Sequence, residues 1–277
     1  MQFFRKYIHL HISYIILIYR YFMLKTDKKK FALLFNLKSI LIFSGARLTY
    51  DGAAFVITDK SFKWFSYKIR HQRQCDMAYQ DGLLNRVEDL AEVYFLKKID
   101  FKDGDIFVDC GANVGDLKLW FKLNSININY VGFEPSPVEF KCLQNNVKPS
   151  KVHNVGLWKD NSELKFYISS QGADSSLIEP EKYEKAIIIN VCRLDSFFDT
   201  KIKCIKLEAE GAEPEVLEGL GDKLKLVEYV SADLGYERGI DAESTLAPVT
   251  NFLLQKNFEL IDVEHTRICA LFRNKNY

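Results

Sequence analysis

The chain has 277 residues, of which 48% are apolar and 27% are charged, so it can bury a sizeable core in one large domain or two small ones. Its formal net charge of +1 gives no electrostatic reason to expect nucleic acid as the main partner. Only six Pro and 14 Gly are present, which argues against long disordered segments.

Residues 1–84 lack the regular pattern of the later chain and are expected to form an N-terminal appendage. From Tyr7 to Tyr19 there is no Lys, Arg, Asp or Glu, but this apolar stretch is shorter than the roughly 20 residues that a bilayer-spanning helix needs. Basic residues flank it, so it suits a helix that makes peripheral contact with an anionic membrane surface. It equally suits a helix packed on the main domain or on a second subunit in a homo-oligomer, and these alternatives remain open.

The rest of the appendage is predicted to contain β-structure. An apolar stretch at residues 31–43 follows a basic run, and strand-like composition then extends to about residue 70. Residues 47–50 and 54–58 predict a hairpin through Asp51 and Gly52, because Asp-Gly favours a tight turn between strands.

Two features concern the cellular compartment. No small-residue cleavage site follows the N-terminal apolar stretch, which argues against a secretory signal. None of the six cysteines forms a C-x-x-C pair, and four stand in apolar, strand-like runs, as is typical of buried thiols in a reduced compartment. We therefore expect a cytoplasmic protein, with membrane association left open by the N-terminal stretch.

From Asn85 onward, an amphipathic helix is followed by alternating strand-like and helical segments. This alternation predicts parallel strands joined by crossover helices in three layers. Strands are expected at residues 106–109, 130–134, 152–154, 204–207 and 227–232, with helices at 114–122, 137–146, 213–219 and 243–256.

Residues 258–264 and 267–273 are too close in sequence for a crossover helix, so these last two strands are expected to pair as an antiparallel hairpin. The expected fold is therefore α/β and Rossmann-like, with a mostly parallel seven-stranded sheet that ends in an antiparallel hairpin. This arrangement is typical of class I methyltransferases, and we assign it to a domain at residues 85–277.

Residues 107–115 predict a strand, a glycine-rich turn and the start of a helix. Gly111 allows a sharp turn where a side chain would collide with a ligand, and Gly115 allows the helix to approach the strand. Asp109 can accept a hydrogen bond from the amino group of a methionine-type ligand. The spacing around Asn113 is G-x-N-x-G, which differs from the G-x-G-x-x-G of a pyrophosphate-binding turn.

A second element strengthens this interpretation. Glu134, followed by Pro135, ends the next predicted strand roughly 20 residues farther on. A carboxylate at this place can bind both hydroxyls of a ribose. Together, the turn and Glu134 predict a nucleoside-binding site.

In these motifs the chain resembles the FkbM-type methyltransferases. The matching segments are residues 107–115, 131–137, 152–157, 173–177, 193–197 and 205–213. The resemblance runs from about residue 88 to the end. It implies an O-methyltransferase that depends on S-adenosylmethionine (SAM) and acts on sugar hydroxyls of glycans or on secondary metabolites. It also implies that Gly156 and Leu157 contribute to the cofactor site beside Asp109, Gly111, Asn113, Gly115, Glu134 and Pro135.

Carboxylates supply the predicted catalytic residues. Glu208 and Glu210 follow the fourth predicted strand, and Asp233 follows the fifth. Two of these residues depart from the pattern of the family that the chain resembles, which usually has Asp in place of Glu208 and Glu in place of Asp233. Close carboxylates raise one another's pKa, which suits one of them to act as a general base on a hydroxyl. We expect Glu208 or Glu210 in this role, supported by Asp233, while Glu213 complements a helix N-terminus.

Other interpretations are weaker. The carboxylates could bind a divalent metal, but no His stands nearby in sequence, so a metal is not favoured. Lys206 is suited to pair with one of the glutamates, and His265 is expected in an exposed turn.

Two alternative functions are disfavoured. The turn spacing and the terminal hairpin disfavour an NAD-dependent oxidoreductase of nucleotide sugars, and the intact nucleoside motif disfavours a non-catalytic membrane-associated scaffold. The expected partner is a small-molecule or glycan acceptor, not nucleic acid.

Overall fold

The computed structural model describes residues 19–60, 62–169 and 174–277. The chain divides into two compact units, Met1–Leu83 and Leu84–Tyr277. Within the described ranges, none of the helices has the length and apolar character needed to cross a bilayer. Most of the apolar stretch predicted from Tyr7 to Tyr19 lies outside the described residues.

The first unit contains an antiparallel sheet of β1 (Ala46–Tyr50), β2 (Phe55–Asp59) and β3 (Phe62–Ile69) together with α2 (Lys28–Leu41) and α3 (Gln72–Tyr79). The predicted hairpin through Asp51 and Gly52 is confirmed, since Tyr50 pairs with Phe55 and Gly52 has a φ of 96°. The Asp51 side chain closes the turn by accepting hydrogen bonds from the backbone of Ala53 and Ala54.

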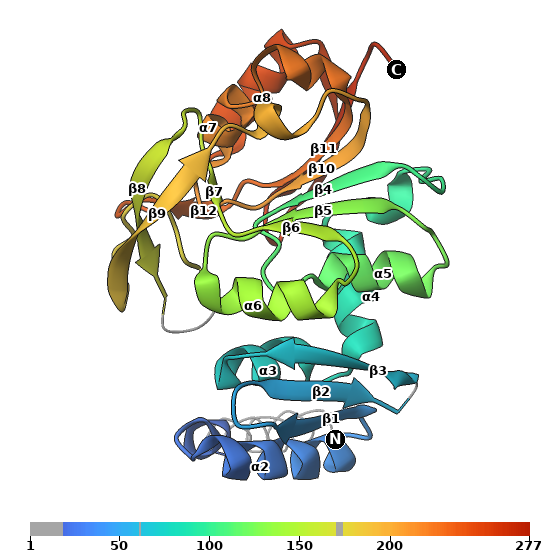
Figure 1. Ribbon diagram of the computed structural model, residues 1–277, viewed down its shortest axis with the longest axis vertical. Coiled ribbons are helices and arrows are strands. Elements are labelled where there is room, and N and C mark those ends of the chain that lie inside the picture. The colour runs from blue at the N-terminus through green and yellow to red at the C-terminus, as the bar shows by residue number, and fades with distance from the viewer. Residues whose placement is uncertain (1–18, 61, 170–173) are drawn as a thin grey trace, which may run out of the picture. The chain divides into compact units, whose positions relative to one another are not determined.

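Helix α2 runs beside β1 (Figure 1), and the side chain of its Asn36 forms hydrogen bonds with the backbone of the strand. Asn36 Nδ2 donates to the Leu48 carbonyl at 2.8 Å, and the Leu48 amide donates to Asn36 Oδ1 at 2.7 Å. Phe31 and Phe35 are fully buried, and the ring of Phe31 lies 5.3 Å from that of Phe55. One face of α2 is therefore committed to the sheet of this unit.

The second unit is built on a seven-stranded sheet in the order β14-β15-β11-β10-β4-β5-β6. Its strands are β4 (Ile106–Cys110), β5 (Asn129–Phe133), β6 (Lys151–His153), β10 (Ile202–Leu207), β11 (Val227–Asp233), β14 (Phe258–Glu264) and β15 (Cys269–Asn274). All pairs are parallel except those of β15, which is antiparallel to both β11 and β14. The predicted class I methyltransferase fold with a terminal hairpin is confirmed.

Helices cover both faces of this sheet. Figure 1 shows α7 (Glu213–Glu218) and α8 (Leu246–Gln255) on one face, with α4 (Leu83–Val93), α5 (Asp116–Leu123) and α6 (Pro137–Asn146) on the other. The central strands are consequently buried on both sides, which explains why they are apolar at successive positions.

Two local predictions were incomplete. The helix expected at residues 243–256 begins only at Leu246, because β13 (Glu243–Ser244) instead pairs with β12 (Tyr236–Arg238). Three further strands form a separate sheet in the order β7-β9-β8, which no sequence pattern predicted. Its strands are β7 (Gly156–Leu157), β8 (Ser162–Ile168) and β9 (Lys185–Cys192).

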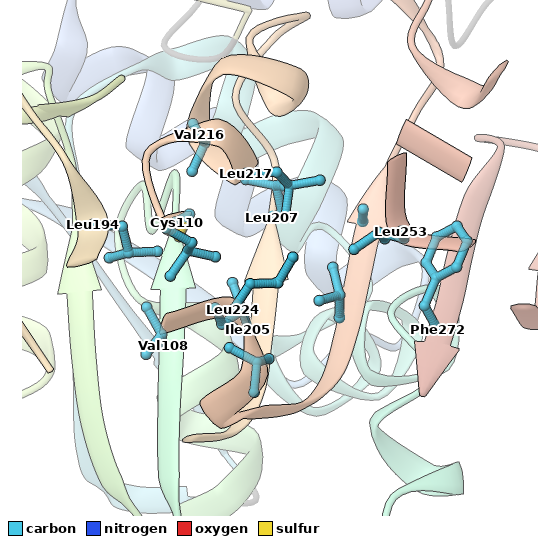
Figure 2. Packing of buried hydrophobic residues seen from close by; sticks show 14 of the residues in the cluster. Val108, Cys110, Leu194, Ile205, Leu207, Val216, Leu217, Leu224, Leu253 and Phe272 are labelled. Atoms are coloured by element: carbon cyan, nitrogen blue, oxygen red, sulfur yellow. The ribbon is translucent and has the colours of Figure 1, made fainter. Parts of the chain in front are cut away.

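A large hydrophobic cluster of the second unit lies between the sheet and helices α7 and α8. Figure 2 shows side chains of β4 and β10, including Val108, Ile205 and Leu207, gathered with Val216 of α7 and Leu224 of the following 3₁₀ helix. All five are at most 2% exposed, and burial of such a side chain contributes about 1.5–3 kcal/mol. This packing holds the central strands in register.

The register places the candidate site residues at one edge. Leu207 of β10 pairs with Cys110 of β4 on one side and with Ala232 of β11 on the other, and Cys110 in turn pairs with Phe133 of β5. From β4 the next strand of the sheet, β5, is added on one side, and from β10 the next strand, β11, is added on the opposite side. A topological switch point therefore lies between β4 and β10. Ligands of open α/β sheets bind at the carboxyl edge beside such a point.

Candidate active site

The glycine-rich turn after β4 is tied to β5. The backbone amides of Gly111 and Ala112 donate to the Phe133 carbonyl at 3.0 and 2.9 Å. Gly111 has a φ of 71°, and a Cβ there would lie 1.9 Å from the Glu208 carbonyl oxygen, so this position requires glycine. Gly115, with a φ of 92°, precedes the first residue of α5.

Glu134 is joined directly to this turn. Its Oε2 accepts a hydrogen bond from the Asn113 amide and its Oε1 from the Ser136 amide, both at 2.8 Å. Burial and the charge of Glu139 raise the pKa of Glu134 to about 8, although the two backbone hydrogen bonds oppose this shift. The structure thus brings Asn113 and Glu134 together, and the half-buried Pro135 follows at the same edge.

Lys206 occupies the centre of the switch point and is almost completely buried. Its Nζ lies 3.2 Å from Asp109 Oδ1 and 2.9 Å from Glu208 Oε2, and it donates to the Gly111 carbonyl at 2.8 Å. Asp109 Oδ2 also accepts a hydrogen bond from the Tyr130 hydroxyl at 2.7 Å. The prediction that Lys206 pairs with a glutamate is confirmed, and the same ammonium neutralises Asp109.

Arg267 supplies the second cation, from the turn between β14 and β15. Its Nη2 donates to Glu208 Oε1 at 2.8 Å and to Asp233 Oδ2 at 2.6 Å. The Glu264 side chain holds this turn by accepting from the backbone amide of Arg267. We call Asp109, Lys206, Glu208, Asp233 and Arg267 the paired cluster.

The paired cluster determines the ionisation of Glu208. Burial alone would raise the pKa of this carboxyl, but the charges of Lys206 and Arg267 outweigh burial and lower the pKa to about 2. The expectation that neighbouring carboxylates raise the pKa is therefore wrong for Glu208. It holds for Asp233, whose pKa is raised by burial and by the charge of Glu208, against the opposing charge of Arg267.

Glu210 lies in a different environment from Glu208. Strand β10 ends at Leu207 and Glu210 has a φ of 51°, so strand alternation does not extend to it. Burial raises its pKa well above the ordinary value, and the charge of Glu237 raises it further. We call Glu210 and Glu237 the acidic pair.

Glu237 was not predicted from the sequence. It lies on the three-residue strand β12, and burial together with the charge of Asp233 raises its pKa. The neighbouring Arg238 fastens β12 to α7 through Glu215, with Nη2 2.7 Å from Oε1. No local sequence pattern places Glu237 beside Glu210, because the two elements meet only in the tertiary structure.

Glu213 serves the loop that carries Glu208 and Glu210. It is the first residue of α7, and its Oε1 accepts from the amides of Ala209 and Gly211. Its Oε2 accepts from Thr245 Oγ1 at 2.9 Å. Its place at the helix N-terminus agrees with the prediction, and these hydrogen bonds fix the backbone on both sides of Glu210.

Comparison with known proteins identifies the family. Residues 109–277 match the family profile described as the methyltransferase FkbM domain. The chain belongs to the FkbM methyltransferase family. Methyltransferase 1 of Beauveria bassiana (strain ARSEF 2860) is 26% identical over 189 residues, which cover 57% of this chain and 74% of that protein.

Two solved structures are similar to this FkbM protein at low identity. The N-terminal domain of human METTL16 in complex with SAH is 14% identical, covers 70% of each chain and has a TM-score of 0.39. A SAM-dependent methyltransferase from Aquifex aeolicus is 11% identical over 68% of this chain and 95% of that chain, with a TM-score of 0.39.

An FkbM methyltransferase uses SAM, and the residues after β4 and β5 fit this cofactor. Asp109 Oδ1 is buried and accepts no hydrogen bond from the described residues, although Lys206 lies beside it. It is therefore available to a cationic donor. The Glu134 carboxylate accepts two hydrogen bonds and has lone pairs for two more. Within the described ranges, no group of three or more His, Cys, Asp or Glu is arranged to hold a metal ion.

The remaining predicted cofactor residues of this FkbM chain, Gly156 and Leu157, lie in β7 and pair with β9. A Cβ at Gly156 would lie 3.0 Å from Val191 Cγ1, and Leu157 packs in the core of the unit. These contacts account for the size of both residues, and their contact with a cofactor stays a prediction. His265 is exposed in the turn before Arg267, as expected.

Proposed function

We propose that this FkbM methyltransferase transfers the methyl group of SAM to a hydroxyl oxygen, with Glu210 as the general base. The observation that carries this proposal is the position and ionisation of Glu210. It follows the carboxyl end of β10, beside the turn after β4, and its pKa is raised by burial and by the charge of Glu237. A sugar in a glycan or a hydroxylated secondary metabolite is the acceptor class that we favour.

Asp109, the turn at residues 111–115 and Glu134 hold the cofactor in this proposal. Asp109 Oδ1 is the acceptor for the amino group of the methionine part, and Glu134 is the acceptor for the ribose hydroxyls. When bound, SAM supplies an electrophilic methyl group on a positively charged sulfur. The sulfonium charge suits an edge of the sheet at which carboxylates gather.

The hydroxyl proton has to leave as the new carbon–oxygen bond forms. The Glu210 carboxylate accepts this proton, so the products are the methyl ether, the neutral Glu210 carboxyl and the demethylated cofactor. A base with a raised pKa retains the proton better than one whose pKa is about 2, which favours Glu210 over Glu208. Glu208 is assigned a positioning role, because Lys206 and Arg267 fix both of its oxygens.

The test combines binding and turnover. The purified full-length protein is incubated with SAM and extracted cell glycans or metabolites, and products are searched by mass spectrometry for the gain of one methyl group. Calorimetric titrations with SAM and with NAD check cofactor choice. We expect SAM binding by the wild type and by Glu210→Gln, with turnover lost only in the variant. Glu218→Gln, at an exposed position of α7, is the matched control.

Two results would contradict the proposal. Unchanged turnover in Glu210→Gln, with SAM still bound, would remove Glu210 from proton transfer. Methylation found on nitrogen or carbon in place of oxygen would leave cofactor binding intact and overturn the assigned reaction.

A further inference from the structure

The two units of the chain carry opposite charge, which the overall net charge of +1 conceals. The first 83 residues contain 14 Lys and Arg, five Asp and no Glu, whereas the other 194 contain 24 Lys and Arg against 32 Asp and Glu. The first unit is thus strongly basic and the catalytic unit is acidic. An asymmetry of this size points to an anionic partner for the basic unit.

Helix α2 is apolar on two opposite faces. One face packs on the sheet of the first unit through Phe31 and Phe35. The other face, which we call the α2 outer face, carries four exposed apolar side chains at helical spacing. They are Leu33, Leu37, Ile40 and Leu41, which are 50–78% exposed. At about 100° per residue these positions lie opposite Phe31 and Phe35, so the core of the unit cannot cover them.

The apolar surface continues past the end of the helix. Phe43 is 95% exposed and has a φ of 57°, in the left-handed region where glycine is usual at the end of a helix. A bulky residue in this conformation costs folding free energy, and an exposed ring recovers none of it from packing. A contact made outside the described fold would account for its presence.

Cationic side chains border the α2 outer face. Lys29 and Lys30 lie one turn before Leu33 on the same side of the helix, and all three are exposed. Asp27 caps the helix by accepting from the backbone amides of both lysines. Cations at a helix N-terminus interact unfavourably with the helix dipole, so Lys29 and Lys30 do not stabilise α2 from this position. Their position suits the binding of an external anion.

We propose that the first unit docks on an anionic lipid bilayer through the α2 outer face and Phe43. In this arrangement the apolar side chains enter the boundary between headgroups and acyl chains, while Lys29 and Lys30 reach the lipid phosphates. The exposed apolar set distinguishes this surface from a purely basic nucleic-acid site. The high positive charge of the unit also disfavours pairing of this face with the same face of a second copy.

The test measures how the full-length protein partitions onto vesicles by flotation. We expect binding to vesicles of phosphatidylcholine with about one third phosphatidylglycerol, weak binding to phosphatidylcholine alone, and release at high salt. The triple variant Leu37→Ser, Leu41→Ser, Phe43→Ser is expected to bind at least about tenfold more weakly. The matched control Ile188→Ser, Ile240→Ser alters equally exposed apolar residues of the other unit and is expected to bind as the wild type does.

Charge and strain are tested separately. Lys29→Glu, Lys30→Glu is expected to weaken binding about tenfold or more, and Lys182→Glu, at an exposed position of the catalytic unit, to leave it unchanged. Phe43→Gly suits the left-handed backbone, so it is expected to keep or raise the melting temperature while weakening vesicle binding.

Three outcomes would overturn the proposal. One is equal partitioning of the wild type onto neutral and anionic vesicles. Another is unchanged vesicle binding by the triple variant when circular dichroism and SAM titration show it folded. The last is a wild type that does not bind vesicles but forms a concentration-dependent dimer, detected by light scattering and lost in the triple variant.

Discussion

The paired cluster and the acidic pair lie at the same edge of the sheet, and Glu208 and Glu210 are only two residues apart. Lys206 and Arg267 contact Glu208 and lower its pKa to about 2. For Glu210, burial and the neighbouring carboxylates raise the pKa. The position of the two cations, more than burial, therefore separates a fixed carboxylate from one able to take up a proton.

Lys206→Met should have the largest effect. It leaves the buried Asp109 without its cation and Glu208 with Arg267 alone, and breaking a buried ion pair from one side typically costs about 3–5 kcal/mol. Denaturant unfolding measures this loss. Lys201→Met, which removes an exposed lysine paired with Glu228, should cost under about 1 kcal/mol. Equal and small losses in both variants would show that Lys206 does not organise the paired cluster.

Glu210→Gln should reduce turnover by about 10²- to 10⁴-fold, the usual contribution of a general base. Its melting temperature should stay level or rise, because the change removes one of two neighbouring, half-buried carboxylates. Initial rates and thermal unfolding measure the two quantities on one sample. A large loss of stability together with the loss of rate would instead indicate a structural role.

Glu208→Gln should have a smaller effect on turnover, about tenfold, because Glu208 positions its surroundings and does not carry the proton. The charge of Glu208 raises the pKa of Glu210, so its removal should lower that pKa. The acidic limb of the pH–rate profile is therefore expected to move to lower pH. If the limb vanishes in Glu208→Gln and persists in Glu210→Gln, the roles of the two residues are reversed.

Glu134→Gln, at the predicted cofactor site, is expected to have the smallest effect, a change in how the melting temperature depends on pH. The pKa of Glu134 is about 8 in the folded protein against 4.5 ordinarily, so its contribution to stability is present below pH 4.5 and is lost as the pH rises to about 8. The melting temperature of the wild type should fall from pH 5 to pH 8 by a few degrees more than that of the variant. An identical pH dependence in both proteins would contradict the raised pKa.

Local patterns were sufficient for much of the catalytic unit. The apolar run at residues 106–109 predicted β4, and the turn residues after it predicted the break before α5. Both predictions succeeded because a buried strand requires consecutive apolar residues and a positive φ favours glycine. The close spacing of residues 258–264 and 267–273 predicted the antiparallel hairpin. The sheet of β7, β8 and β9 was missed because Gly156 and Leu157 pair with residues more than 30 positions away.

The order of residues along the chain shows that Glu208 and Glu210 come just after β10, that Asp233 ends β11, and that Lys206 stands beside Glu208. The ionisation of these groups depends on contacts that exist only in the folded protein. Arg267 is 59 residues from Glu208 in sequence, and Glu237 acts on Glu210 from a strand that no periodicity predicts. Interactions between charges depend on distance in space and on burial, and the chain brings these groups together only once the sheet has formed.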